Sequence, residues 1–130
     1  MEKNQMIKEV LQKMGVNVKY DEDGDLLLRF QMKYIYVAAN EEQKYVSLVF
    51  PSYMEVDEDE MTSTLIVCNK MTREIKLLKV FMNQSLDSVS ASCEFFYTDC
   101  SSLENSLRKA LDIISVVRTL FRRTKKKLSQ

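Results

Sequence analysis

The chain has 130 residues, of which 45% are hydrophobic, and 19 basic residues balance 19 acidic ones, so its formal net charge is zero. This length is typical of one domain, and this composition excludes a disordered chain. The zero net charge argues against a protein devoted to nucleic acid, which usually carries a strong basic excess.

The first element predicted is a helix. Apolar residues recur with the spacing of one helix face, which predicts about four turns that Gly15 ends. These residues are Met6, Ile7, Val10, Leu11 and Met14.

Alternating strands follow the helix. A strand is predicted over residues 16–20, and the acidic turn 21–25 comes next. The run 26–39 is apolar at every even position from 26 to 38. It is too long for one ordinary strand, so we split it near residues 31–33. A turn at 40–43 then leads to a strand over 45–50, which Pro51 closes.

The second half begins with a short helix, which the acidic residues 57–60 start and which buries Met61, Leu65 and Cys68. Strands are predicted over 75–82 and 89–97. The last helix opens with a capping box in which Ser101 is the N-cap and Glu104 is the third residue. Its core stripe is Leu103, Leu107, Ala110, Leu111, Ile114, Val117 and Phe121.

The order of elements is therefore α-β-β-β-α-β-β-α. It predicts an α+β protein with a single domain over residues 1–121 and a basic C-terminal tail over 122–130.

The residue types that enzymes use most are absent or poorly spaced. The chain has no histidine and only two glycines, so it lacks the Ser-His and Cys-His nucleophile pairs and a glycine-rich phosphate loop. Its cysteines, Cys68, Cys93 and Cys100, form no CxxC motif and suit neither a metal site nor a disulfide framework. We therefore expect no enzyme, and we predict no catalytic residues, metal, cofactor or small-molecule substrate.

Two acidic segments are candidate cation sites. Asp21-x-Asp23-x-Asp25 resembles the start of a calcium loop, but Leu26 stands where that loop needs glycine and Met32 where it needs glutamate. A solvated turn is the better interpretation. The acidic cluster 55–60 could bind a divalent cation or a basic partner, although a helix start with a charged surface also explains it.

Several side chains are candidates for external contacts. The strand aromatics Tyr34, Tyr36, Tyr45, Phe50, Phe81, Phe95, Phe96 and Tyr97 are expected mostly in the core. Neighbours such as Phe95 and Phe96 cannot both face inward, which makes Phe96 a candidate partner contact.

The last helix adds two further candidates. Ile113, Val116 and Leu120 widen its apolar arc and predict contact with a partner or a second copy, unless the first helix packs there. Its basic end could contact phosphates or anionic lipid. It lacks aromatics for base stacking, so we favour a solvated helix end and do not expect nucleic-acid or membrane contact. The basic residues are Arg122, Arg123, Lys125, Lys126 and Lys127.

The whole pattern is similar to the YbjN-like family, which has the type III secretion chaperone-like fold. The resemblance rests on the acidic turn Asp21–Gly24, the stretch Leu65–Asn69, and the run from Lys76 through Met82 into Val89–Phe95 before the long helix.

This resemblance implies an antiparallel sheet of five strands flanked by helices, and a non-enzymatic role. Secretion chaperones of this fold act as dimers that hold a segment of an effector in extended form. We therefore expect a protein-binding module, chaperone-like or regulatory, with a protein partner and potentially a homodimeric state. The alternative is a regulator or scaffold that meets nucleic acid or anionic lipid through its basic tail. The N-terminus has no apolar segment like that of a signal peptide, so we expect a cytoplasmic location.

Overall fold

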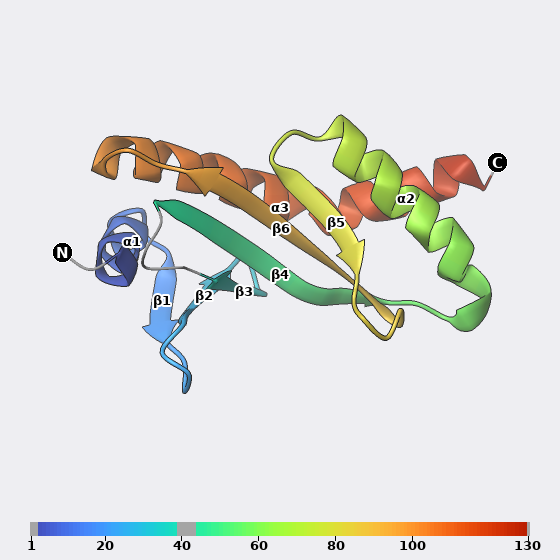
Figure 1. Ribbon diagram of the computed structural model, residues 1–130, viewed down its shortest axis with the longest axis horizontal. Helices are drawn as coiled ribbons and strands as arrows, with labels where there is room; N and C mark the ends of the chain where they lie inside the picture. Colours follow the sequence, from blue (N-terminus) through green and yellow to red (C-terminus); the bar gives the residue numbers. More distant parts are fainter. Residues whose placement is uncertain (1–2, 39–43, 130) are drawn as a thin grey trace.

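The computed structural model, which describes residues 3–38 and 44–129, contains a six-stranded antiparallel sheet and three α-helices (Figure 1). The strands lie side by side in the order β1-β2-β3-β4-β6-β5. In chain order the elements are α1 (Lys3–Lys13), β1 (Asn17–Tyr20), β2 (Leu26–Phe30), β3 (Lys33–Ala38), β4 (Tyr45–Glu55), a 3₁₀ turn (Glu58–Glu60), α2 (Met61–Glu74), β5 (Leu78–Met82), β6 (Ser88–Phe96) and α3 (Cys100–Leu128).

The α+β class and the succession of helices and strands are confirmed, but the sheet has six strands instead of the predicted five. The difference arises before α2. The segment 16–20, both halves of the run 26–39 and β4 each form a strand, as predicted for the segments one by one, whereas the predicted order of elements counted only three strands there. The turn predicted at 40–43 lies outside the described residues.

A two-residue turn between β2 and β3 changes which side chains face the core. Gln31 and Met32 have positive φ angles of 50° and 64°, although neither is a residue type that favours them. In the resulting register Leu28 pairs with Ile35, and both are fully buried. Even positions therefore face the core in β2, whereas odd positions face it in β3.

β4 continues past Pro51, where we predicted its end, and stops at Glu55. Its register against β6 shifts between Phe50 and Met54, which marks a bulge. Proline is tolerated at a bulge because no ladder hydrogen bond is needed there. The backbone N–H of Ser52 instead donates to the Ser90 hydroxyl over 2.8 Å.

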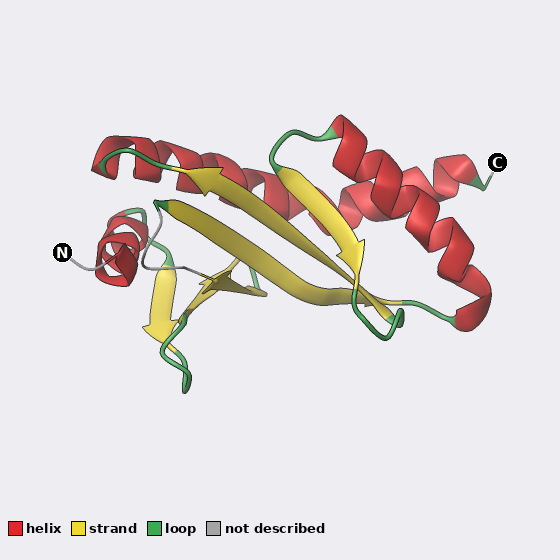
Figure 2. Cartoon of the chain, viewed as in Figure 1, coloured by secondary structure: helices red, strands yellow, loops and turns green. Residues whose placement is uncertain are grey.

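All three helices pack on one face of the sheet around a single core. Figure 2 shows α3 running along β6 and β4, and α2 lying beside β5. The predicted core stripe of α3 is confirmed, because all seven of its residues are buried. Each strand contributes one row of side chains to the core. Fully buried members of these rows include Leu26, Leu28, Ile35, Val46, Leu48, Val89, Ala91 and Cys93.

The buried side of α2 differs from the prediction. Cys68 is buried as expected, but Met61 is only partly buried and Leu65 is 46% exposed. The stripe is instead formed by the positions i, i+3, i+4 and i+7 that begin at Thr64, one residue before Leu65. Its members are Thr64, Val67, Cys68 and Met71.

The cap of α3 lies two residues before the predicted one. Asp99 is the N-cap, and its carboxylate accepts a hydrogen bond from the Ser102 backbone N–H at 2.8 Å. The Ser102 hydroxyl accepts one from the Asp99 backbone N–H at 3.1 Å, which completes a capping box. The hydrogen bond from the Ser102 N–H, and after it the Ser102 side chain, favours the charged carboxylate and lowers the pKa of Asp99.

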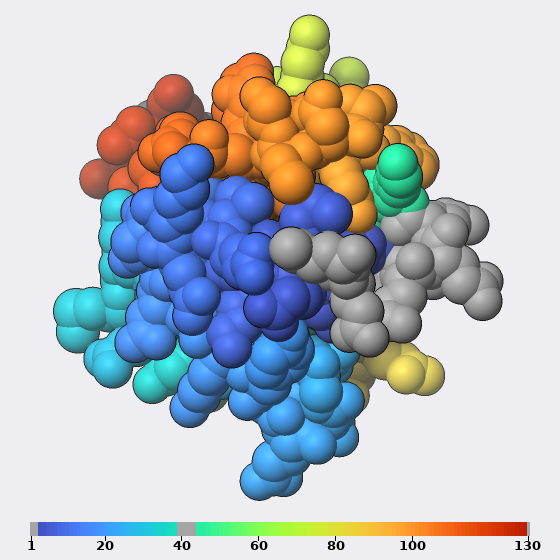
Figure 3. All heavy atoms as spheres, turned by 90° about the vertical axis from the view of Figure 1, so that its left-hand side faces the viewer, coloured from blue at the N-terminus to red at the C-terminus, as the bar shows by residue number. Residues whose placement is uncertain are grey.

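The two ends of the chain lie at opposite ends of the molecule (Figure 1). In Figure 3 the dark blue α1 lies below the orange first turns of α3, which it contacts. The residues predicted as a basic tail continue α3 as helix through Leu128. The structure does not test whether they are a unit separate from the domain, so that division stays a prediction.

Candidate functional site

The two faces of the sheet differ in what covers them. The inner face carries the core and the helices. Three hollows open on the opposite face, and none of them is lined by a residue of the described helices. We call this opposite face the outer face. Because side chains alternate along a strand, the strand pairing places on it Leu27, Arg29, Tyr34, Tyr36, Tyr45, Ser47, Val49, Lys79, Phe81, Ser88, Ser90, Ser92, Glu94 and Phe96.

A row of serines forms the floor of the outer face along β6. Ser88, Ser90 and Ser92 are only 8%, 5% and 3% exposed. They are covered because the neighbouring strands place larger side chains beside the short hydroxyls. The row is therefore the bottom of a shallow trough, which we call the serine trough.

Apolar side chains stand on both sides of this trough. Val49 of β4 lies directly across from Ser92, and Phe81 of β5 lies directly across from Ser90. Tyr36 of β3 lies next to Val49 and widens the apolar wall. These side chains line a hollow of about 310 Å³ over the middle of the trough.

An ion pair between β5 and β6 lies at the same hollow. Lys79 Nζ lies 2.6 Å from Glu94 Oε1, and the two side chains are 56% and 43% exposed. Ion pairs exposed to this degree contribute little to stability. The pair can therefore separate at little energetic cost and leave the floor open to a ligand.

The trough ends at an exposed aromatic residue. Phe96 is 78% exposed, whereas Phe95 is 7% exposed, so the expectation that only one of these neighbours faces inward is confirmed. The rings of Phe96 and Tyr45 meet edge to face with centroids 6.0 Å apart. They contribute to a hollow of about 300 Å³. The role of Phe96 as a partner contact stays a prediction.

Tyr34 and Tyr36 were expected in the core, and the structure places both on the outer face. Tyr34 is 55% exposed, with the Arg29 guanidinium 5.8 Å from its ring centre. Both face outward because the positions that face the core change from even in β2 to odd in β3 at the two-residue turn. The signal in the sequence was the change of the aliphatic residues from even positions, at Leu26 and Leu28, to odd positions, at Ile35 and Val37.

One edge of the sheet is closed by α2. The Thr72 hydroxyl accepts a hydrogen bond from the Val80 backbone N–H at 2.9 Å and donates one to the Val80 carbonyl at 3.2 Å. An unpaired strand edge would otherwise be a template for another strand. β5 therefore offers a partner less free backbone than a bare edge would.

The core cysteines are protected thiols. Burial raises the pKa of Cys68 to about 11 and that of Cys93 to about 12. Both therefore stay protonated at neutral pH, and neither is an activated nucleophile.

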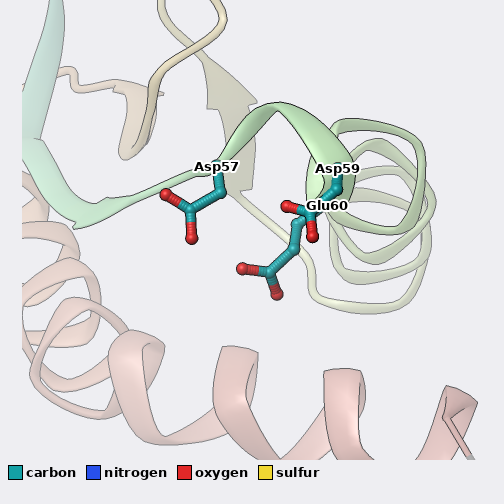
Figure 4. A group of neighbouring side chains, drawn as sticks. All are labelled: Asp57, Asp59 and Glu60. Carbon is teal, nitrogen blue, oxygen red and sulfur yellow. The ribbon is translucent and has the colours of Figure 1, made fainter.

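The acidic segment before α2 lies against the end of α3. Figure 4 shows Asp57 in the connection from β4, with Asp59 and Glu60 in the turn that begins the helix. Their carboxylates lie within 4.8 Å of one another. Glu60 already forms an ion pair with Lys125 of α3. Within this segment Glu60 is therefore paired inside the chain.

The remaining candidates on α3 have mixed environments. Ile113 and Leu120 are partly buried against the chain's own core, while Val116 is 46% exposed. The basic residues other than Lys125 are exposed, namely Arg122, Arg123, Lys126 and Lys127. Their contact with a partner, a second copy or an anion stays a prediction.

A sequence model of the family described as T3SS (YopN, CesT) and YbjN peptide-binding chaperone 1 matches residues 2–125. The chain belongs to this family. It is a family of peptide-binding chaperones and not of enzymes. No curated protein sequence matches the chain significantly.

Solved structures with the same fold agree with this assignment. The crystal structure of YbjN from E. coli superposes with a TM-score of 0.68 at 10% identity, covering 95% of this chain and 92% of that one. The Yersinia pestis type III secretion chaperone SycH, solved with a fragment of YscM2, gives a TM-score of 0.56 at 13% identity, covering 84% and 93%. A protein from Methanothermobacter thermautotrophicus gives a TM-score of 0.51 at 12% identity, covering 91% of this chain and 98% of that one.

The resemblance to the YbjN-like family and to the type III secretion chaperone-like fold is thus confirmed. Among the residues that the structure describes, no helix has both the length and the apolar character needed to cross a bilayer.

Proposed function

We propose that this chain is a peptide-binding chaperone module that holds an extended segment of a partner protein in the serine trough of its outer face. The observation that carries the proposal is that no residue of a described helix lines the three hollows of this face, which has an apolar wall and a polar floor. The family's peptide-binding character supports it.

The shape and chemistry of the trough suit an extended peptide. From Ser88 to Phe96 the strand rises by roughly 26 Å, which matches about eight extended residues. The short serine side chains keep the floor low between their larger neighbours, and those of Ser88 and Ser90 already bond Ser52, so the floor is fixed in place. Val49, Phe81 and Phe96 offer apolar contacts for alternate side chains of the segment. A segment on such a surface is held by side-chain contacts, with apolar residues at alternate positions.

The experiment is a selection of dodecapeptides from a random-sequence display library on the immobilised protein, followed by fluorescence anisotropy of one enriched peptide. Phe96→Ser and Phe81→Ser should each raise its Kd about tenfold, as expected for anchor residues of a binding surface. Failure to enrich any peptide would contradict the proposal.

Val116→Ser is the matched control, because it removes an exposed apolar side chain from α3. We expect its Kd to stay within about twofold of the wild-type value, because Val116 lies on α3 and not on the outer face, and few residues carry most of the binding energy. If Val116→Ser weakens binding while both phenylalanine variants bind normally, the site is on α3 and the outer face is not used.

A further inference from the structure

The serine trough runs into an acidic hollow at the end opposite Phe96. This hollow has a volume of about 440 Å³ and includes the carboxylates of Glu55, Asp57 and Asp87 in its lining. Ser88 belongs both to its wall and to the trough floor. A segment lying in the trough therefore reaches the hollow without leaving the outer face.

The local structure holds these carboxylates in place. The Val56 backbone N–H donates to the Asp87 carbonyl at 2.8 Å, which ties the extension of β4 to the β5–β6 turn. Within that turn the Asn83 side-chain amide donates to Asp87 Oδ1 at 2.6 Å, and its oxygen accepts from the Asp87 N–H at 3.0 Å. The Ser52 hydroxyl, at the bulge, lies 3.2 Å from that of Ser88. The hollow is thus formed before any ligand arrives.

The hollow carries negative charge. Among residues 3–38 and 44–129, no basic side chain lines it. The ion pairs among the described residues join Lys70 to Glu74, Lys79 to Glu94, Arg108 to Glu104 and Lys125 to Glu60, and none uses a carboxylate of the hollow. Three carboxylates around one concavity focus a negative potential that attracts a cation.

We propose that the partner segment carries a lysine or arginine whose cation enters this acidic hollow, an inference that rests on the proposed function. Charge complementarity selects this occupant, since the continuous outer face supplies the binding surface and the hollow supplies the unpaired charge. Ser92, under the apolar hollow, lies four residues along β6 from Ser88. In an extended peptide this spacing corresponds to about 13 Å. The basic residue therefore stands about four positions from an apolar residue of the same segment.

The test begins with the dodecapeptides that the wild-type protein selects from the random library. We expect enrichment of lysine or arginine about four positions from an apolar residue. The double variant Glu55→Gln with Asp57→Asn keeps the shape of the hollow and removes two charges. Its Kd for an enriched peptide should rise about tenfold, and replacing the basic residue of the peptide by methionine should raise the wild-type Kd equally. When both changes are combined, the Kd should rise no further, because they remove the same interaction.

The matched control is Glu22→Gln with Asp23→Asn, which removes the same two charges from the exposed β1–β2 turn. Its Kd should equal that of the wild type. The inference is overturned if the enriched peptides contain no excess of lysine or arginine and the double variant at Glu55 and Asp57 binds them normally. If these peptides still lose affinity for Phe81→Ser and Phe96→Ser, the proposed function stands. If the library yields no binding peptide, the proposed function fails and the inference fails with it.

Discussion

The inner and outer faces of the sheet are built from the same six strands, yet they contain different kinds of side chains. The inward rows are apolar and mostly buried, as at Leu48 and Ala91. The outward rows combine buried serines with exposed aromatics and an ion pair, as at Ser92, Phe96 and Glu94. Because alternate residues of each strand face opposite sides, the outer surface can be changed by substitution without disturbing the core.

The largest expected effect is on the inner face. Leu111→Ala and Ile114→Ala should each lower the free energy of unfolding by roughly 2–5 kcal/mol, because they leave cavities in the core where these residues are 2% and 0% exposed. Urea unfolding measures the loss. Phe96→Ala is the matched outer-face variant, and an equal loss for Phe96→Ala would break the comparison.

The closed edge of β5 gives a smaller effect. Thr72→Val keeps the shape of the side chain but removes both hydrogen bonds to Val80, so it should cost about 1–2 kcal/mol of unfolding free energy. Thr72→Ser retains the hydroxyl and serves as the control. If the valine and serine variants unfold at the same urea concentration, the hydroxyl does not close this edge.

The cap of α3 makes stability depend on pH. The pKa of Asp99 is lowered in the folded protein, mainly by the Ser102 N–H, so its contribution is present above the unfolded pKa near 3.8 and is lost as the pH falls through the folded value. Asp99→Asn should therefore be less stable than wild type at pH 7, and the difference should shrink in acid. A difference that does not change between pH 7 and pH 2 would show that the carboxylate charge is irrelevant.

The smallest effect is expected for the ion pair on the outer face. Lys79→Met should change the free energy of unfolding by no more than about 0.5 kcal/mol, since solvent screens exposed pairs. Thermal unfolding at low and at high salt measures it. A loss above about 1 kcal/mol, beyond the usual range for exposed pairs, would mean that the outer face also stabilises the fold.

Strong periodic signals made much of the fold predictable. The stripe from Leu103 to Phe121 has helical spacing over five turns of α3, and Val89 to Tyr97 alternates without interruption, so both were identified correctly. The break near residues 31–33 was predicted and is confirmed, but the tight two-residue turn that reverses the inward positions was not foreseen, because its positive φ angles fall on Gln31 and Met32, which do not signal them. That error hid Tyr34 and Tyr36 from the candidate site.

The candidate site was harder to predict than the fold. Phe96 could be recognised, because two adjacent phenylalanines cannot share one face of a strand. The acidic hollow could not, since Glu55 and Asp87 lie far apart in the chain. They meet through the pairing of β4 with β6 and the bulge beyond Phe50. Sequence periodicity contains no information on such a meeting.

Backbone amide chemical shifts, recorded while an enriched peptide is titrated into isotope-labelled protein, test the central claim most directly. The account predicts that the largest shifts follow the serine trough, at Ser88, Ser90, Ser92 and Phe96, and that amides around Val116 on α3 hardly move. Large shifts confined to the basic end of α3, from Arg122 to Lys127, would contradict the claim that the outer face is the binding surface.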